Sequence, residues 1–107
     1  MKMNIQTRDE ELKGHEEFVE RRMAFALARF SGRVRELRVR LSDINAHRGG
    51  IDKQCLIEAS LEPRGTLIVS VEDSNIESAV SRAADRAARQ LDARFKKTRD
   101  VKRRSIA

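Results

Sequence analysis

Four short segments of the chain alternate apolar and polar residues, which is the pattern of a strand with one buried and one solvated face. These segments span residues 3–7, 36–42, 54–62 and 67–71. Pro63-Arg64-Gly65, between the last two segments, is typical of a tight turn. The last two strands are therefore predicted to form an antiparallel hairpin.

Two longer segments repeat apolar residues at the 3.6-residue period of a helix. The first is predicted to run from about His15 to Phe30, after a charged connection over residues 8–14. The second is predicted to begin near Asn75, where Ser74-x-x-Glu77 is typical of a capping box, and to run past Lys97. The apolar stripe of this second helix consists of Ile76, Val80, Ala83, Ala87, Leu91 and Phe95.

The resulting order of elements, β-α-β-β-β-α, predicts an α+β fold with a four-stranded mixed sheet. A βαβ crossover makes the first two strands parallel, and short connections make the later strands antiparallel to their neighbours. Both helices are predicted to pack on one face of the sheet and to leave the other face in water. We expect one folded domain over residues 1–97, followed by a basic and flexible tail over residues 98–107.

The composition is that of a small, basic protein without membrane segments. A length of 107 residues fits one domain, and the single Cys55, which alternates into an apolar row, excludes an internal disulfide and any Cys-based zinc site. No apolar run approaches the roughly 20 residues of a membrane span, and the N-terminus lacks the apolar region of a signal peptide. We therefore expect a cytoplasmic protein with no membrane partner.

The net charge of +6 is concentrated in the last third of the chain. Residues 78–107 carry ten basic and three acidic side chains, whereas residues 55–77 carry one basic and five acidic side chains. Such asymmetry predicts that the last third meets an anionic partner, with nucleic acid as the first candidate. The alternative is a solvated helix with a basic tail.

A projection of the second helix at 100° per residue places five basic residues on the side opposite the apolar stripe. They are Arg82, Arg86, Arg89, Lys96 and Lys97. A cationic stripe roughly 20 Å long can follow the phosphates of a nucleic acid. The alternative is pairing within the helix at i,i+4, of Asp85 with Arg89 and of Asp92 with Lys96.

The first helix carries a second candidate surface beside its apolar face, made of Phe18, Arg22, Phe25 and Arg29. Phe18 is expected to pack between the helices. Phe25 is either partly exposed, so that it extends a basic surface with Arg22 and Arg29, or a peripheral core residue. Arg48, in the loop before Gly49-Gly50, is a further candidate contact because loops reach partners.

The chain offers little material for catalysis. Its two histidines, His15 and His47, have no neighbouring nucleophile or metal-ligand spacing in the sequence, and there is no Gly-rich phosphate loop. We expect no enzyme activity, no cofactor and no metal site. All four Phe are predicted to lie on helices and there is no Trp or Tyr, so RNA is expected to be recognised by its folded shape and charge.

Several stretches resemble the ribosome hibernation-promoting factor family, also called ribosome-associated inhibitor A or sigma-54 modulation proteins. They are the opening Met3-Asn4-Ile5, residues 17–23 (Glu-Phe-Val-Glu-Arg-Arg-Met), residues 85–91 (Asp-Arg-Ala-Ala-Arg-Gln-Leu) and the loop from Asp43-Ile44-Asn45 to Asp52-Lys53-Gln54-Cys55. The similarity in spacing extends from Met3 to about Lys97. Two positions depart from the family, with Phe25 in place of a common Lys and Glu77 in place of a frequent Tyr.

The resemblance implies a short-form family member that docks on the small ribosomal subunit, against 16S rRNA in the channel for messenger and transfer RNA. Such a protein hibernates ribosomes during stress or stationary phase, and it inhibits translation by occupancy. By matching position, Arg22, Arg86 and Arg89 inherit RNA-contacting roles, whereas Arg82 rests on the helix projection alone. The alternative function is a basic interaction or regulatory subunit that binds an acidic protein partner.

Overall fold

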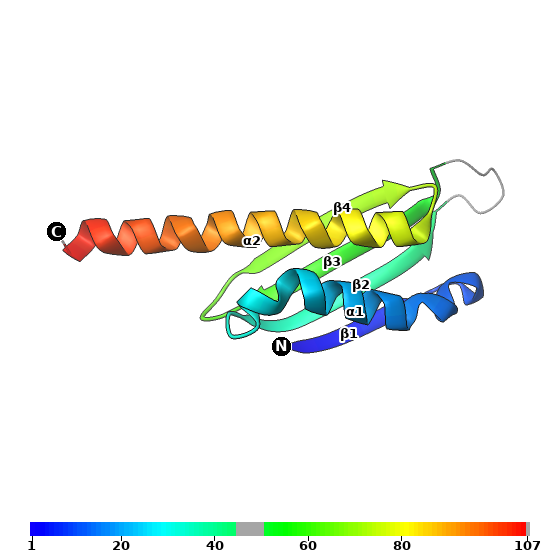
Figure 1. Ribbon diagram of the computed structural model, residues 1–107, viewed down its shortest axis with the longest axis horizontal. Coiled ribbons are helices and arrows are strands. Elements are labelled where there is room, and N and C mark those ends of the chain that lie inside the picture. Colours follow the sequence, from blue (N-terminus) through cyan, green and yellow to red (C-terminus); the bar gives the residue numbers. More distant parts are fainter. Residues whose placement is uncertain (45–50, 107) are drawn as a thin grey trace.

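The structure is a computed structural model that describes residues 1–44 and 51–106, and the side chains of all these residues except 10, 11 and 98–106. Its elements are β1 (Lys2–Thr7), the 3-10 helix η1 (Glu10–His15), α1 (Glu16–Leu27), the 3-10 helix η2 (Ala28–Phe30), β2 (Val34–Asp43), β3 (Lys53–Leu61), β4 (Thr66–Asp73) and α2 (Ile76–Ile106). The predicted order β-α-β-β-β-α is confirmed (Figure 1).

The four strands form one mixed sheet in the order β1-β2-β3-β4. β1 runs parallel to β2, and β3 is antiparallel to both β2 and β4, as predicted. The register places Ile5 opposite Val39, Val39 opposite Ile57 and Ile57 opposite Val69. Because side chains alternate between the faces of a strand, this apolar row lies on one face of the sheet.

Both helices cover that apolar face, and the other face of the sheet is open (Figure 1). From the helices, Met23 and Leu91 are fully buried, and burial of an apolar side chain of this size stabilises the fold by about 1.5–3 kcal/mol. α2 approaches the sheet through small residues, since Ala79, Ala83 and Ala87 are also fully buried. The predicted apolar stripe of α2 is thus confirmed.

The turn between β3 and β4 lies at the predicted position. The backbone N–H of Leu61 donates to the carbonyl of Gly65 across 2.9 Å, and the Glu62–Pro63 peptide bond is cis. Gly65 has φ of 104°, a backbone conformation that favours glycine. This turn brings β4 back alongside β3 as the last strand of the sheet.

Three predictions about helix boundaries are corrected. The connection predicted over residues 8–14 contains η1, where Leu12 is buried although its neighbours are polar, so no periodicity revealed it. The predicted first helix tightens into η2 after Leu27. At the start of α2, the side chain of Asn75 accepts the N–H of Ser78 across 3.0 Å. The cap is therefore Asn75, one residue later than the predicted capping box.

The helix α2 runs past Lys97, as predicted, and its backbone remains helical to Ile106. Residues 98–106 contain neither Gly nor Pro, and their Lys and Arg residues favour a helix. Figure 1 shows this end of α2 projecting beyond the sheet, which contributes to the longest dimension of 58 Å. The flexibility expected of residues 98–107 stays a prediction.

Candidate nucleic-acid interface

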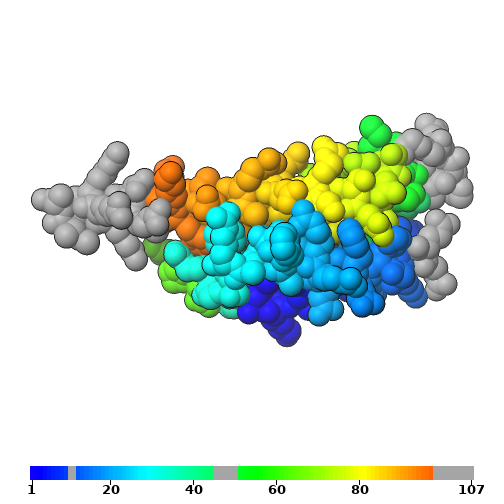
Figure 2. Space-filling model, in the orientation of Figure 1, coloured from blue at the N-terminus to red at the C-terminus, as the bar shows by residue number. Residues whose placement is uncertain are grey.

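The cationic face of α2 consists of Arg82, Arg86, Arg89, Lys96 and Lys97, all of which lie outside the buried stripe; Arg86 is half-buried and the other four are exposed. Figure 2 shows α1 and α2 next to each other on the helical side of the molecule. Arg22 and Arg29 of α1 and η2 lie on this helical layer. Arg48 lies outside the residues that the structure describes, so its predicted contact stays a prediction.

Two members of the cationic face bond to the edge of the sheet. Arg82 Nη1 lies 3.1 Å from Asp73 Oδ2 and 3.4 Å from the carbonyl of Glu72. Arg86 Nη1 donates to the carbonyl of Ser70 across 3.3 Å. The neighbouring Arg94 makes the same kind of bond to the carbonyl of Thr66 across 3.1 Å.

These bonds have a structural reason, because β4 is an edge strand and its outward carbonyls have no partner strand. The sequence projection gave the direction of each arginine around the helix axis but not the strand beside it. A guanidinium has five N–H donors, so an arginine that uses one or two of them on β4 still carries its charge and free donors. Arg82 and Arg86 therefore combine a structural contact with capacity for an anion.

The other three members of the cationic face are exposed. Among the side chains that the structure describes, none lies within hydrogen-bonding or ion-pairing distance of Arg89, Lys96 or Lys97. The alternative pairings within the helix are thus not formed. These three residues present the least neutralised positive charge of the predicted site.

The two aspartates of α2 pair with the first helical segment instead. Asp85 Oδ1 lies 2.6 Å from Arg22 Nη2, and Asp92 Oδ1 lies 3.7 Å from Arg29 Nη1. The Arg22 side chain is only 23% exposed, whereas that of Arg29 is 60% exposed. Arg22 is therefore a partly neutralised member of the predicted RNA-binding set, and Arg29 is the more accessible one.

The two candidate aromatic residues of α1 differ in burial. Phe18 is half-buried and packs against the core. Phe25 is 83% exposed, which decides between the two alternatives for this residue in favour of a surface position. It lies on the same helical layer as the basic residues.

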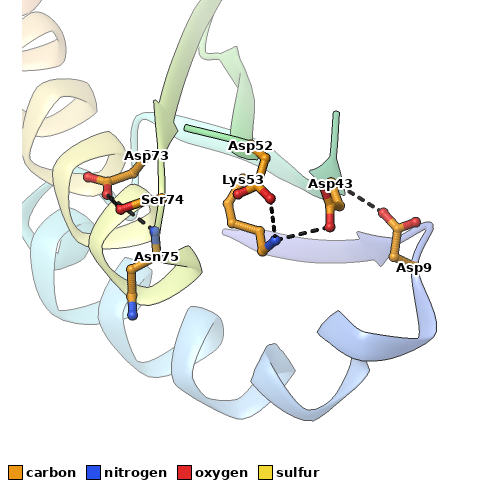
Figure 3. A network of polar contacts seen from close by, with 7 residues as sticks. All are labelled: Asp9, Asp43, Asp52, Lys53, Asp73, Ser74 and Asn75. Carbon is orange, nitrogen blue, oxygen red and sulfur yellow. Dashed lines mark hydrogen bonds and ion pairs between the residues drawn. The ribbon is translucent and has the colours of Figure 1, made fainter. Parts of the chain in front are cut away.

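A polar network that the sequence analysis did not single out holds both ends of the loop over residues 45–50 (Figure 3). Lys53 Nζ lies 3.0 Å from Asp43 Oδ2 and 3.1 Å from Asp52 Oδ2, and Asp9 accepts the N–H of Asp43 across 2.8 Å. Hydrogen bonds from Lys53 to Asp43 and then to Asp52 raise the pKa of the lysine. The sign of this network in the sequence is the pair of acidic residues, Asp43 and Asp52, that flank the loop.

The family model for sigma 54 modulation protein / S30EA ribosomal protein matches residues 4–99 of the chain. The chain belongs to this family. All residues of the cationic face of α2, and Arg22 and Arg29, lie within the matched part of this S30EA-family chain. The family comprises ribosome-associated factors and is not known as an enzyme family.

Solved structures of similar fold agree with this assignment. The N-terminal domain of Thermus thermophilus Protein Y is 25% identical, with a TM-score of 0.67 over 85% of this chain and 96% of that one. A ribosomal subunit interface protein from Coxiella burnetii is 14% identical, with a TM-score of 0.70 over 90% of this chain and 98% of that one, and shares the fold. No match was found among curated protein sequences.

The described part of this S30EA-family chain shows no group of three His, Cys, Asp or Glu side chains placed to hold a metal ion. His15 lies at the start of α1, with its Nδ1 3.8 Å from Glu77 Oε1. Cys55 is a buried core residue, as predicted, and burial raises its pKa to about 12.

No described helix has both the length and the hydropathy that crossing a membrane requires.

Proposed function

We propose that this protein is a translation inhibitor that binds the small ribosomal subunit through 16S rRNA, in the channel for messenger and transfer RNA. It silences ribosomes during stress or stationary phase by occupying this channel, without catalysing a reaction. A protein that binds ribosomes in this way works in the cytoplasm.

The observation that carries the proposal is the exposed row of Arg89, Lys96 and Lys97 on α2, whose charges no described side chain neutralises. Arg82 and Arg86 extend this row along the same helix and keep unused donors. A row of cations on a rigid helix releases counterions when it meets phosphates, which favours binding to a polyanion. Membership of a family of ribosome-associated factors supports ribosomal RNA as that polyanion.

The test is co-sedimentation with purified small subunits in sucrose gradients. The variant carries Arg89→Glu, Lys96→Glu and Lys97→Glu, because these side chains support no described contact of the fold. Reversal of three positive charges should reduce co-sedimentation by about 100-fold or more, since each lost phosphate contact also becomes a repulsion. Arg82 and Arg86 are left unchanged because they bond to β4.

A matched control carries Lys2→Glu, Arg8→Glu and Arg40→Glu. All three residues are exposed: Lys2 lies on β1, Arg8 directly follows β1, and Arg40 lies on β2. Both triple variants have the same net charge, so they separate the position of the charge from its total. Retained binding by the control and loss by the α2 variant are expected. Equal binding by both variants and the unaltered protein would contradict the proposed surface.

The alternative of an acidic protein partner is addressed in the same assay by competition. Free 16S rRNA should displace the protein from small subunits if RNA is the target. Displacement by an acidic polypeptide of equal charge, but not by 16S rRNA, would instead favour a protein partner. The formal net charge of +6 is compatible with either anion, so the competitor decides.

A further inference from the structure

Phe25 is the most exposed large apolar residue of the described chain, at 83%, and it lies on α1. The other exposed large apolar residues are Met1, Ile44, Ile51 and Ile68, and none of these four belongs to a helix. A phenylalanine in this position adds almost no burial to the fold, because the core side of α1 is supplied by other residues. A ring that stabilises the fold so little suggests a role in contact with a partner.

The surroundings of Phe25 form a shallow surface hollow of about 280 Å³, lined by Phe18, Arg21, Arg22 and Phe25. These positions lie three, four and seven residues apart, so they follow one side of the helix. Arg22 is held in place by its 2.6 Å contact with Asp85. Arg21 is 77% exposed and lies 3.2 Å from Glu17, which is also exposed.

The size and chemistry of this hollow favour a flat, electron-rich occupant beside negative charge. Unpaired RNA bases stack on aromatic rings and on arginine guanidinium planes, and the hollow offers both. A protein partner normally needs about 800 Å² of its own surface, whereas Phe25 is the only exposed large apolar residue described on this layer. The basic residues of α2 on the same side of the molecule suit the phosphates that accompany a base.

We propose that Phe25 is a stacking platform for one unpaired base of the bound RNA, with Arg21 and Arg22 beside it. This inference rests on the proposed function, and it adds a contact with a base to a surface otherwise expected to read shape and charge. The predicted RNA-binding set thereby gains an aromatic member.

The first experiment uses fluorescence, because the chain has no Trp or Tyr. Phe25→Trp places a single indole at the proposed platform, and Ile68→Trp places one on the open sheet face, where Ile68 is 62% exposed. Both variants are titrated with a single-stranded RNA decamer, with an RNA duplex of the same charge, and with small subunits. We expect quenching of the indole at position 25 by the decamer and by small subunits, with little change for the duplex or at position 68.

Quenching at both positions alike, or at neither, would overturn the proposal. Quenching at position 25 that grows with protein concentration in the absence of RNA would overturn it as well, because it would show a second copy of the chain as the occupant. A shift of the indole spectrum only with a protein fraction of the ribosome would assign the hollow to a ribosomal protein.

The second experiment measures binding of Phe25→Tyr, Phe25→Leu and Phe25→Ala to small subunits. Since Phe25 is exposed, all three variants should keep the circular dichroism and melting temperature of the unaltered protein. Stacking predicts near-normal binding for Tyr, and binding weaker by about 5- to 150-fold for Leu and Ala. Normal binding by Leu together with weak binding by Ala would indicate an apolar side chain as the occupant and contradict stacking.

The two proposals fail in different ways in this experiment. If the unaltered protein does not bind small subunits, the proposed function itself is wrong. If it binds, and all three Phe25 variants bind equally well, only the stacking platform is wrong. The Arg89, Lys96 and Lys97 reversal, measured in parallel, shows whether the loss of binding expected for charge is detected by the same assay.

Discussion

Arg22 of α1 donates to Asp85 of α2 across 2.6 Å, although the two residues are 63 positions apart in the chain. The pair joins the two helices that carry the candidate interface. Arg22 is one of the predicted RNA contacts, and Asp85 already neutralises part of its charge before any RNA binds. The strength of RNA binding should therefore depend on Asp85 as well as on the basic residues.

Replacement of Asp85 by Ala should tighten RNA binding by a few-fold, because it frees Arg22 and removes a negative charge from the interface. Stability should change little, since ion pairs of this accessibility contribute about 0–1 kcal/mol. Binding to small subunits at low salt and a melting curve measure both effects. Glu36→Ala, which removes a carboxylate from β2, is the charge-matched control, and weaker binding by Asp85→Ala would contradict the prediction.

The salt dependence of binding should report how many members of the cationic face meet phosphates. Substitution of Arg89, Lys96 and Lys97 by Gln should lower the slope of log K against log salt by about 2 to 3, at roughly 0.7–0.9 per phosphate contact. Affinities measured between 50 and about 200 mM salt provide this slope. An unchanged slope would show that these side chains do not meet phosphates in the complex.

The pKa of Asp73 depends on Arg82. The hydrogen bond from Arg82, followed by that from the backbone N–H of Asn75, holds this pKa below its ordinary value of 3.8. Because the pKa of Asp73 is lower in the folded chain, its ionised carboxylate stabilises the fold above about pH 4. This stabilisation is lost as the pH falls through the folded-state pKa. Arg82→Gln should raise the pKa of Asp73, which NMR titration of the carboxyl group measures.

In the same variant, the free energy of unfolding should depend less on pH in the acidic range than it does in the unaltered protein. Denaturant unfolding at several pH values below neutrality tests this consequence. Arg40→Gln, an exposed change on the sheet, provides the control. A pKa of Asp73 that is equal in Arg82→Gln and in the control would refute the assigned cause.

Cys55 should be chemically inert while the protein is folded. Burial raises its pKa from 9.0 to about 12, so the reactive thiolate is scarce at neutral pH, and the side chain is inaccessible. A thiol reagent at pH 8 should therefore modify it only as fast as the sheet opens.

The sign of the pH effect follows from the same shift. The unfolded thiol ionises near its ordinary pKa while the folded thiol stays neutral, so its contribution to stability is complete below pH 9 and is lost between pH 9 and about 12. Cys55→Ala should lack this loss in alkaline unfolding experiments. Rapid modification of the folded protein would show that the β3 strand is more accessible than its burial indicates.

The fold was predictable because its strands follow simple patterns. Alternation along β2 and β3 identified a half-buried sheet, and the Pro63–Gly65 turn fixed the direction of β4. The stripe on α2 gave both its buried side and its cationic face. In contrast, Leu12 is one apolar residue among charged ones, and a single buried side chain leaves no period to detect.

The partners of the charged residues were not predictable from the sequence. Spacing at i,i+4 suggested that Asp85 pairs with Arg89, but the approach of α1 offers Arg22 instead. The same projection could not show that Arg86 reaches the carbonyl of Ser70, because the strand beside a helix is set by the tertiary fold. Positions on one element were therefore well predicted, and contacts between elements were not.

The bonds from Arg82, Arg86 and Arg94 to β4 have a consequence for the behaviour of the protein at high concentration. An edge strand with free carbonyls is a template on which another chain can add a strand and start aggregation. Here three outward carbonyls, those of Glu72, Ser70 and Thr66, are already occupied by these arginines. Solubility and affinity for anions thus share side chains, and any change of the chain that removes Arg82 or Arg86 alters both together.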